Sequence, residues 1–433
     1  MRKFLISAEQ LVTIAFLMIY SGTPLDAFLT SGYTVKEGDR IIFRLLFTLT
    51  YIVSLFLITL RWKKVSYVFS RDKFIWLLLL VCALSIFWSL DSDITIRRVF
   101  GLAGTMLFGL YFASRYTLNE QLKLCAYMLG ISAFMCLVFA VLFPQYGIGS
   151  AGDPTAWRGI YPQKNVLGKR FVLSAAIFLF LAMTNRENRR FSWLGYIISA
   201  ALVLLSKSTT SLGNLIIITA VFLTYDRILR LNYKVMIPTL TLLSTISVAF
   251  YTFFTLQADT ILGTVGKNTT LTGRADLWPA VLNMIEKKPW LGYGYGAFWI
   301  GDTSESSIVI QAIQWDAPNA HNGFLDLWLA VGLVGVLVFL IGFVINFLRA
   351  IYLFRWNQKA EHLWLLVYLT FIILSNLTET TLLEQNSLEW ILYVSAVLSS
   401  KLCTGANINR LPQSHDKATQ CFEPPNAPKS QLP

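Results

Sequence analysis

The chain has 433 residues, of which 55% are hydrophobic and 14% are charged, and its formal net charge is +12. Both fractions lie far from those of soluble domains, so the composition indicates a polytopic membrane protein. Most basic residues occur in short loops on one side of the predicted membrane helices, which makes the net charge mainly a topology signal. Nucleic-acid binding would need basic residues gathered on one exposed soluble face, and the sequence does not have that pattern.

About twelve apolar runs are candidates for membrane-spanning helices. In chain order they are residues 8–28, 41–60, 74–90, 99–114, 124–143, 166–184, 193–205, 211–225, 236–256, 322–348, 363–383 and 388–402. The seventh and eighth are the weakest, because each is short and only a few residues separate them. We expect an all-α polytopic membrane protein with both termini in the cytoplasm, since the basic loops lie on the side of the termini.

The predicted organisation has four parts. Residues 1–256 form an N-terminal transmembrane bundle of about nine spans, and residues 257–321 form a long loop on the outer side. Residues 322–403 form the last three spans, and residues 404–433, which are rich in Pro, Asn, Ser and Gln, form a disordered cytoplasmic tail. A loop as long as 257–321 inside a compact bundle is usually functional or disordered, and its residue pattern indicates structure.

An amphipathic helix is predicted within this loop, from the segment DLWPAVLNMIEKKP. Asp276 is the expected N-cap, and Lys288-Pro289 is the expected stop. The residues expected on the apolar face are Trp278, Val281, Leu282 and Ile285.

The glycines Gly292, Gly294 and Gly296 follow this helix at alternate positions. This spacing fits a tight turn or a close backbone approach better than a strand interior. A dinucleotide-binding loop is rejected, because the strand–turn–helix setting is missing.

Several basic residues lie on the outer side, against the topology rule, so each needs a partner or a polar cavity. For Arg97, Lys207, Lys287 and Lys288, a contact with a lipid phosphate is as good an explanation as a functional one. Four others belong to longer motifs, which favours function: Arg158, Lys164, Arg170 and Arg274.

The motifs are RGIYPQKNVLGKRF (158–171), LLSKSTTSL (204–212), TGRADLWPAVLNMIEKKPWLGYGYGAFW (272–299) and AHNGFLDLWLAVGLVG (320–335). In order and spacing they resemble the O-antigen ligase and polymerase superfamily of bacterial envelope glycosyltransferases. The segment SIFWSLDSDITIRRVFGLAGT (85–105) is most similar to exopolysaccharide polymerases of the rhizobial succinoglycan type. The resemblance extends over residues 74–384.

This resemblance implies a GT-C-like, metal-independent transferase without a cofactor, at the periplasmic face of the bacterial inner membrane. The long loop would then be periplasmic, and the donor would be a glycan on undecaprenyl pyrophosphate. By position, Arg158, Arg170 and Arg274, joined by Lys164, would hold the pyrophosphate. His321 would act on the acceptor hydroxyl, and Asn322 and Asn165 would orient groups or contact the acceptor.

Two positions depart from the family pattern. Ala330 stands where an acidic residue often precedes the glycine of the histidine motif, and Lys207, with Thr209 and Thr210, stands where arginine is frequent. Both departures bear on which residues contact the acceptor.

The chemistry of the residues leads to similar roles. Asp91 and Asp93 have the spacing of an Asp-x-Asp metal motif, but in a short turn they are more simply turn formers. The five cysteines have no C-x-x-C pairing, so neither a metal site nor a disulfide is indicated. Arginine can bind phosphate oxygens with two parallel hydrogen bonds, so protein cations could replace a metal.

Glycosyl transfer also requires a general base that works near neutral pH. The ordinary histidine pKa of about 6.5 suits this role. His321 is the histidine predicted on the outer side. The alternative for His321 is a helix-start residue whose ring caps backbone donors or lies in the lipid headgroup layer.

Three functions are therefore compared. The first is a polymerase that joins undecaprenyl-pyrophosphate-linked oligosaccharide repeat units, with a chain-length regulator, export proteins and membrane lipid as further partners. The second is a ligase that transfers finished glycan to lipid A core or protein. The third is a transporter or flippase, which should show repeated halves and broken helices at matching depth.

Overall fold

The computed structural model describes residues 2–22, 37–150, 153–186, 188–239, 241–242, 245, 274–300 and 305–402. In this part of the chain the elements of the first half are α1 (Arg2–Ser21), α3 (Glu37–Thr59), α4 (Trp62–Phe69), α5 (Lys73–Leu84), η1 (Ser85–Trp88), α6 (Ser92–Arg115), α7 (Leu118–Leu142), α8 (Pro144–Gly147), β1 (Ile148–Ser150) and β2 (Asp153–Trp157). Those of the second half are α9 (Lys164–Thr184), α10 (Arg189–Leu205), α11 (Thr209–Leu229), α13 (Arg274–Lys287), α14 (Ser306–Ile313), α15 (Gly323–Asn357), α16 (Ala360–Asn376) and α17 (Leu388–Leu402).

Six helices among the described residues are long and apolar enough to cross a membrane: Ile41–Thr59, Ser92–Arg115, Leu118–Leu142, Lys164–Thr184, Thr209–Leu229 and Gly323–Trp356. Shorter apolar helices lie at Ile6–Ser21, Lys73–Trp88, Ala360–Asn376 and Leu388–Ser400. The protein is therefore an all-α multi-pass membrane protein, as the composition indicates.

Wherever the structure describes a predicted apolar run, that run contains helix. The ninth run, 236–256, begins as helix through residue 239, and most of its remainder lies outside the described residues. The end of the first run and the predicted tail 404–433 also lie outside them. Helix α16 ends at Asn376 rather than near 383, because the Asn376 Oδ1 atom accepts the backbone N–H groups of Thr381 (2.8 Å) and Leu382 (3.0 Å) and turns the chain.

Helices α5, α6 and α7 begin with side-chain caps. Asp91 accepts a hydrogen bond from the backbone N–H of Ile94 (2.9 Å) at the start of α6, which confirms its interpretation as a local structural residue. Thr117 and Glu120 form a capping box at the start of α7. Helix α6 ends at Arg115 and α7 begins at Leu118, so a short connection joins these two long helices.

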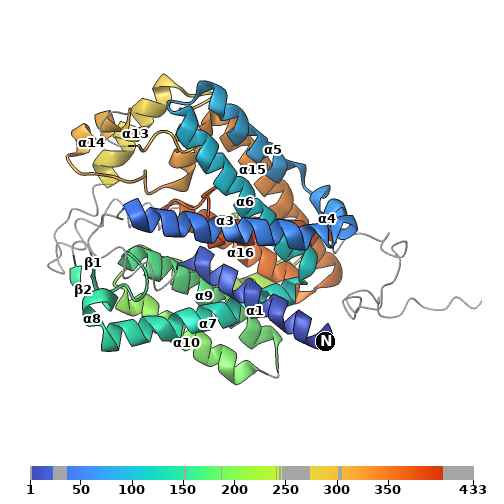
Figure 1. The fold of residues 1–433 in the computed structure, drawn as a ribbon. Coiled ribbons are helices and arrows are strands. Elements are labelled where there is room, and N and C mark those ends of the chain that lie inside the picture. The colour runs from blue at the N-terminus through green and yellow to red at the C-terminus, as the bar shows by residue number, and fades with distance from the viewer. Residues whose placement is uncertain are drawn as a thin grey trace, which may run out of the picture.

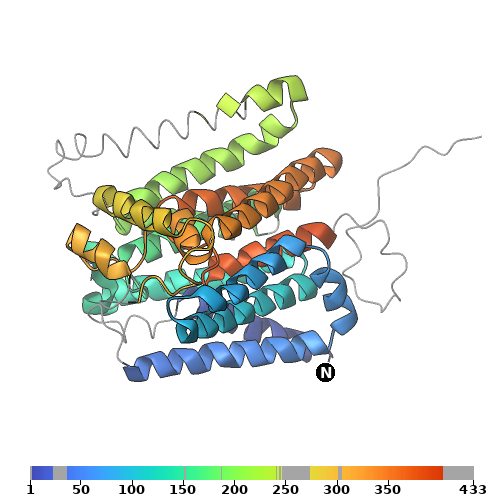
Figure 2. The same cartoon turned by 90° about the horizontal axis from the view of Figure 1, so that it is seen from above.

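The helices form one bundle with two distinct ends (Figure 1). At one end lie α13 and α14, together with β1 and β2, while the start of α1 lies at the other end. The second view gives the same division, and the end of α17, in red, points towards the end of the bundle that holds the start of α1 (Figure 2). We call the end with α13, α14 and the two strands the loop end.

The described part of the long loop has a hydrophobic core of its own, which confirms that it is structured. This core combines α13, α14 and the first turns of α15: Leu277, Val281, Met284, Ile285, Tyr293, Phe298, Val309, Ala317, Ala320 and Leu329. Two details of the predicted helix were wrong. The described part of helix α13 already includes Arg274, so Asp276 lies within the helix and is not the N-cap, and Pro279 lies inside the helix. Leu282 is exposed, because Leu277, Val281 and Met284 make up the buried face at helical spacing.

Helix α15 is interrupted at Gly332, whose φ of 68° and ψ of −173° are accessible essentially to glycine alone. Residues 289–296, which we call the glycine loop, pair with the backbone groups freed at this break. The hydrogen bonds run from Tyr293 N to Leu329 O (2.7 Å), from Gly294 N to Ala330 O (3.1 Å), from Leu333 N to Pro289 O (2.8 Å) and from Val334 N to Trp290 O (3.3 Å).

The predicted close backbone approach of the glycines is confirmed at this break. A Cβ atom at Gly292 would lie 2.5 Å from Leu329 O, and one at Gly332 would lie 2.1 Å from Trp290 O. The glycine loop therefore fixes the outer turns of α15, at whose start His321 lies.

Candidate active site

His321 lies directly before α15, in the left-handed region at φ 48°. Its backbone N–H donates to Asn319 Oδ1 (2.9 Å), and its ring lies 6.1 Å from the Trp315 ring. The imidazole Nδ1 atom lies 3.9 Å from Glu379 Oε2, and both side chains are less than one fifth exposed. This arrangement pairs the histidine with a carboxylate at the loop end of the bundle.

The segment around His321 is anchored by the carboxylate of Asp326, one turn into α15. This carboxylate accepts hydrogen bonds from Trp299 Nε1 (2.8 Å) and from the backbone N–H of Ala320 (3.1 Å to each oxygen). The hydroxyl of Thr380 also donates to Asp326. Asp326 therefore joins three segments that meet at His321.

Asn322 is the N-cap of α15. Its Oδ1 atom accepts the backbone N–H groups of Phe324 (3.0 Å) and Leu325 (3.3 Å). Its side-chain oxygen is thus used to start the helix, whereas Glu379 is the group that faces the histidine ring.

Glu379 belongs to residues 377–387, which connect α16 to α17 and which we call the acidic loop because it carries Glu379 and Glu384. The carbonyl of Glu379 accepts the backbone N–H of Gly323 (3.1 Å). A Cβ at Gly323 would lie 2.0 Å from Asn376 Oδ1, so only glycine allows this approach. The acidic loop is therefore attached directly to the start of α15.

Arg170, on the second turn of α9, is fully engaged by protein groups. Its Nη1 atom lies 2.5 Å from Glu389 Oε2, and its Nε donates to Ser21 O (2.9 Å) at the end of α1. The Arg170 side chain is 9% exposed and that of Glu389 is 0% exposed. A buried pair of this kind ties α9, α17 and α1 together.

Arg158 lies in the connection between β2 and α9 and is half-buried. Its two Nη atoms make long hydrogen bonds to backbone carbonyls, at 3.5 Å to Pro162 O and 3.4 Å to Gln145 O. Lys164 and Asn165 are the first two residues of α9 and are also half-buried.

The motif with Lys207 lies against the motif with Lys164. Lys207, at φ 52°, donates from its ammonium to the hydroxyl of Thr155 on β2. A Cβ at Gly168 of α9 would lie 2.4 Å from Ser211 Oγ, so this glycine brings α9 close to the start of α11. The pKa of Asp153 on β2 is lowered, first by hydrogen bonds from Thr155 and then by the nearby charges of Lys207 and Lys164.

The predicted site residues thus fall into three groups at the loop end. His321 and Asn322 lie beside the acidic loop, Arg170 lies where this loop enters α17, and Arg158, Lys164 and Asn165 lie near the strands. Arg274 is the first residue of α13, and its side chain lies outside the described residues. In the part of the chain that the structure describes, no three His, Cys, Asp or Glu side chains are grouped as a metal site would require.

Comparison with known proteins agrees with these motifs. Residues 171–340 match the family model described as O-antigen ligase. The chain is therefore similar to the O-antigen ligase family over this region. The matched region runs from α9 into α15 and contains His321, Asn322 and Arg274, while Arg170 immediately precedes it.

One curated relative resembles the chain over a longer stretch than the family model matches. The exopolysaccharide production protein ExoQ of Rhizobium meliloti (strain 1021) is 23% identical over 293 residues. The matched region covers 65% of this chain and 66% of ExoQ, so it spans just under two thirds of that relative's length.

Sequence reasoning missed four acidic residues of the loop end: Asp326, Glu379, Glu384 and Glu389. Glu384 and Glu389 fall between or inside apolar runs, where an acidic residue needs a cationic partner, so they could have been matched with Arg170. Ala330 occupies a position where the family often has an acidic residue. Asp326 supplies a carboxylate one turn earlier along α15. Glu379 carries no comparable signal, because its relation to His321 depends on how α16 packs against α15.

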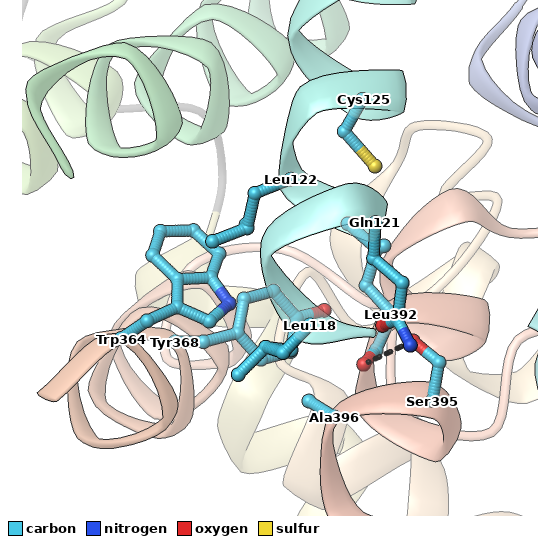
Figure 3. Close-up of a pocket in the computed structure, with 9 residues that line it drawn as sticks. All are labelled: Leu118, Gln121, Leu122, Cys125, Trp364, Tyr368, Leu392, Ser395 and Ala396. Carbon is cyan, nitrogen blue, oxygen red and sulfur yellow. Dashed lines mark hydrogen bonds between the residues drawn. The ribbon is translucent and has the colours of Figure 1, made fainter. Parts of the chain in front are cut away.

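A small pocket lies between helices of the bundle (Figure 3). It is formed by the starts of α7 and α16 and by α17, and its lining residues are Leu118, Gln121, Leu122, Cys125, Trp364, Tyr368, Leu392, Ser395 and Ala396. The start of α16 follows the end of α15 that is remote from His321. This largely apolar pocket is therefore separate from the O-antigen ligase motifs.

Proposed function

We propose that the protein is a polysaccharide polymerase that transfers a growing glycan from undecaprenyl pyrophosphate to the free end of another lipid-linked repeat unit. The match to the O-antigen ligase family model supports a glycosyltransferase, and the relative named for exopolysaccharide production supports a polymer product. The observation that carries the proposal is the pairing of His321 Nδ1 with Glu379 at 3.9 Å.

His321 is the general base in this proposal. With Nδ1 directed to Glu379, the Nε2 atom is the nitrogen that takes the proton from the acceptor hydroxyl. The acceptor oxygen forms the new bond to the anomeric carbon, and the bond from that carbon to the pyrophosphate oxygen breaks. Undecaprenyl pyrophosphate leaves with the electron pair of that bond.

The cations of the loop end bind the leaving pyrophosphate in this proposal. Arg158 is suited to this role because its Nη atoms make only long bonds to carbonyls, which an anion can replace. Lys164 and Arg274 are assigned to the same role by their motifs. Arg170 is held by Glu389 and Ser21, so it contributes positive charge and holds helices in place rather than offering free donors. Fixed protein cations of this kind can stabilise the leaving group without a metal ion.

The orientation in the membrane follows the same proposal. The loop end faces the periplasm, and both termini lie in the cytoplasm of a bacterium, with the protein in the inner membrane. The proposed domain organisation has the four parts that the sequence predicts: 1–256, 257–321, 322–403 and 404–433. A chain-length regulator and export proteins are the proposed partners beside lipid.

The deciding experiment measures the size of lipid-linked glycans in cells that carry His321→Ala, expressed at the wild-type level, and in cells that lack the gene. A polymerase predicts that single lipid-linked repeat units accumulate in both strains while polymer disappears. Normal polymer in His321→Ala cells but not in the deletion would remove His321 from the mechanism. Retention of configuration at the anomeric carbon, measured by NMR on donor and product, would contradict direct attack by the activated hydroxyl.

The ligase is the second candidate, because the matching family model is described as O-antigen ligase. It shares the donor site and differs in the acceptor, which would be lipid A core or protein. Long lipid-linked polymer that accumulates without transfer in the deletion strain would favour this function over the polymerase.

A further inference from the structure

The segment 314–322 connects α14 to α15. Gln314, in the left-handed region at φ 58°, ends α14. Ala317 and Ala320 are buried in the core of the long loop, and the backbone N–H of Ala320 donates to the carboxylate of Asp326 (3.1 Å to each oxygen). The segment is therefore packed against the loop core and attached to α15.

Trp315 lies on this segment beside His321. Its side chain packs against the core of the long loop. Its ring centroid lies 6.1 Å from that of the imidazole, and the two ring planes are 30° apart. Glu379 Oε2 lies 3.9 Å from Nδ1 of the same imidazole. The histidine ring therefore has an indole and a carboxylate as neighbours, from two different segments of the chain.

Four tryptophans around the long loop donate their indole N–H to a protein group. They are Trp88 to Leu291 O (2.8 Å), Trp278 to Ala320 O (3.0 Å), Trp299 to Asp326 Oδ1 (2.8 Å) and Trp328 to Pro289 O (2.8 Å). The Nε1 atom of Trp315 is buried, and among the residues that the structure describes it has no hydrogen-bond partner. Trp315 thus differs from these four in carrying a buried donor for which the described fold supplies no acceptor.

A buried donor without an acceptor is rare in folded proteins, because it has lost its hydrogen bonds to water and gained none in exchange. Such a donor beside a candidate catalytic residue indicates a substrate atom that accepts the bond. The indole N–H donates and cannot accept, so this atom must carry a lone pair. The indole of Trp315 therefore marks a contact for an oxygen atom of a substrate bound at His321.

The charges near His321 decide which part of the substrate this oxygen belongs to. Glu379 and Asp326 both bring carboxylates to this region, and a pyrophosphate would be repelled by them. The hydroxyl and ring oxygens of a saccharide are uncharged and accept hydrogen bonds. An indole also offers an apolar surface beside its polar N–H, which suits a sugar ring. The surroundings of Trp315 therefore fit a saccharide better than a pyrophosphate.

We propose that Trp315 binds the acceptor saccharide, and that its indole N–H donates to a hydroxyl or ring oxygen of the sugar whose reacting hydroxyl lies at His321. This rests on the proposed glycosyl transfer. Trp315 contacts the saccharide away from the bond that forms, so it contributes to affinity and to the choice of acceptor. A site that hydrogen-bonds a sugar oxygen discriminates against a sugar that lacks it.

The kinetic test uses the full-length protein in lipid nanodiscs, with the lipid-linked saccharide extracted from cells that lack the gene as substrate. Trp315→Phe keeps an aromatic ring and removes the N–H. It is expected to raise KM about 3- to 10-fold, the effect of losing one uncharged hydrogen bond, while kcat changes by less than about twofold. Trp356→Phe is the matched control, because Trp356 is 77% exposed near the end of α15 that is remote from His321, and it should leave KM as in the wild type.

A stability measurement separates a contact with substrate from a structural role. With no substrate present, Trp315→Phe should unfold at the same temperature as the wild type or at a higher one, because it removes a buried donor that no described group satisfies. Trp278→Phe should unfold at a lower temperature, because it removes the N–H that Ala320 O accepts at 3.0 Å. The two substitutions are chemically identical, so a difference between them reports what each indole N–H contacts.

Two results would overturn the proposal and leave the proposed glycosyl transfer in place. An unchanged KM in Trp315→Phe would mean that the indole N–H makes no bond to the saccharide. A loss of stability in Trp315→Phe as large as that in Trp278→Phe, or the absence of a thermal unfolding transition, would make Trp315 a structural residue. If the wild-type protein does not elongate the extracted saccharide at all, the proposed function itself fails.

Discussion

The Nδ1 atom of His321 lies 3.9 Å from Glu379 Oε2, although 58 residues separate the two along the chain. The carbonyl of Glu379 also accepts the backbone N–H of Gly323, so the same residue is attached to the start of α15. A carboxylate therefore lies beside the histidine ring at the start of α15.

Replacement of Glu379 by glutamine should therefore lower kcat more than it changes KM. The variant keeps the shape of the side chain but loses the charge that favours an imidazolium at His321 in the transition state. We expect kcat to fall by about 10- to 100-fold, within the range of general-base contributions. The measurement is the initial rate of elongation of extracted lipid-linked saccharide, with Glu286→Gln on α13 as the control. An equal loss of rate in both variants would show that general surface charge, and not the pairing, matters.

The break in α15 gives a prediction about stability. Alanine at Gly332 would place a Cβ 2.1 Å from Trp290 O at a backbone conformation that favours glycine, so Gly332→Ala should lose the pairing with the glycine loop. We expect the free energy of unfolding to fall by about 1–3 kcal/mol from backbone strain alone. Thermal unfolding in detergent measures this.

Gly213 in α11 is the matched control for Gly332, since no atom lies within 4 Å of a Cβ built there. Gly213→Ala should leave the unfolding temperature unchanged or raise it, because alanine restricts the unfolded chain. A lower unfolding temperature in Gly213→Ala that matches the one in Gly332→Ala would argue against a special backbone conformation at Gly332.

The sequence allowed much of this fold to be predicted because it depends on local signals. Apolar runs of sufficient length mark the helices, and Gly292 with its neighbouring glycines marks a close backbone approach. The partners could not be predicted in the same way. The pairs His321–Glu379 and Arg170–Glu389 join helices far apart in the chain, and nothing local indicates which charges meet. The wrong N-cap at Asp276 has a similar cause, because packing of Leu277 into the loop core favours helix at residues before Asp276.

Arg158 leads to a prediction about binding of the donor. Because its guanidinium makes only long hydrogen bonds, to Pro162 O and Gln145 O, Arg158→Ala should change stability little. We expect KM for the lipid-linked donor to rise by about 10- to 100-fold, since charge-assisted bonds to phosphate are lost. Arg158→Lys should restore part of the affinity but not the two-bond geometry. Arg189→Ala, at the start of α10, is the control and should leave KM for the donor unaltered.

Glu384 predicts a dependence of stability on pH. Its pKa in the folded protein is raised above the value of an unfolded glutamate, mainly by desolvation. The folded state therefore binds this proton more tightly than the unfolded state, and its contribution to stability is greatest at pH values below the unfolded pKa. That contribution is lost as the pH rises through the folded pKa, because the desolvated carboxyl must then ionise. Glutamine cannot ionise, so Glu384→Gln should unfold at a higher temperature than the wild type near pH 7, and the difference should shrink towards pH 4. Unfolding temperatures of both proteins across this range measure the effect, and a variant that is less stable than the wild type at pH 7 would mean that attraction to Lys169 outweighs desolvation.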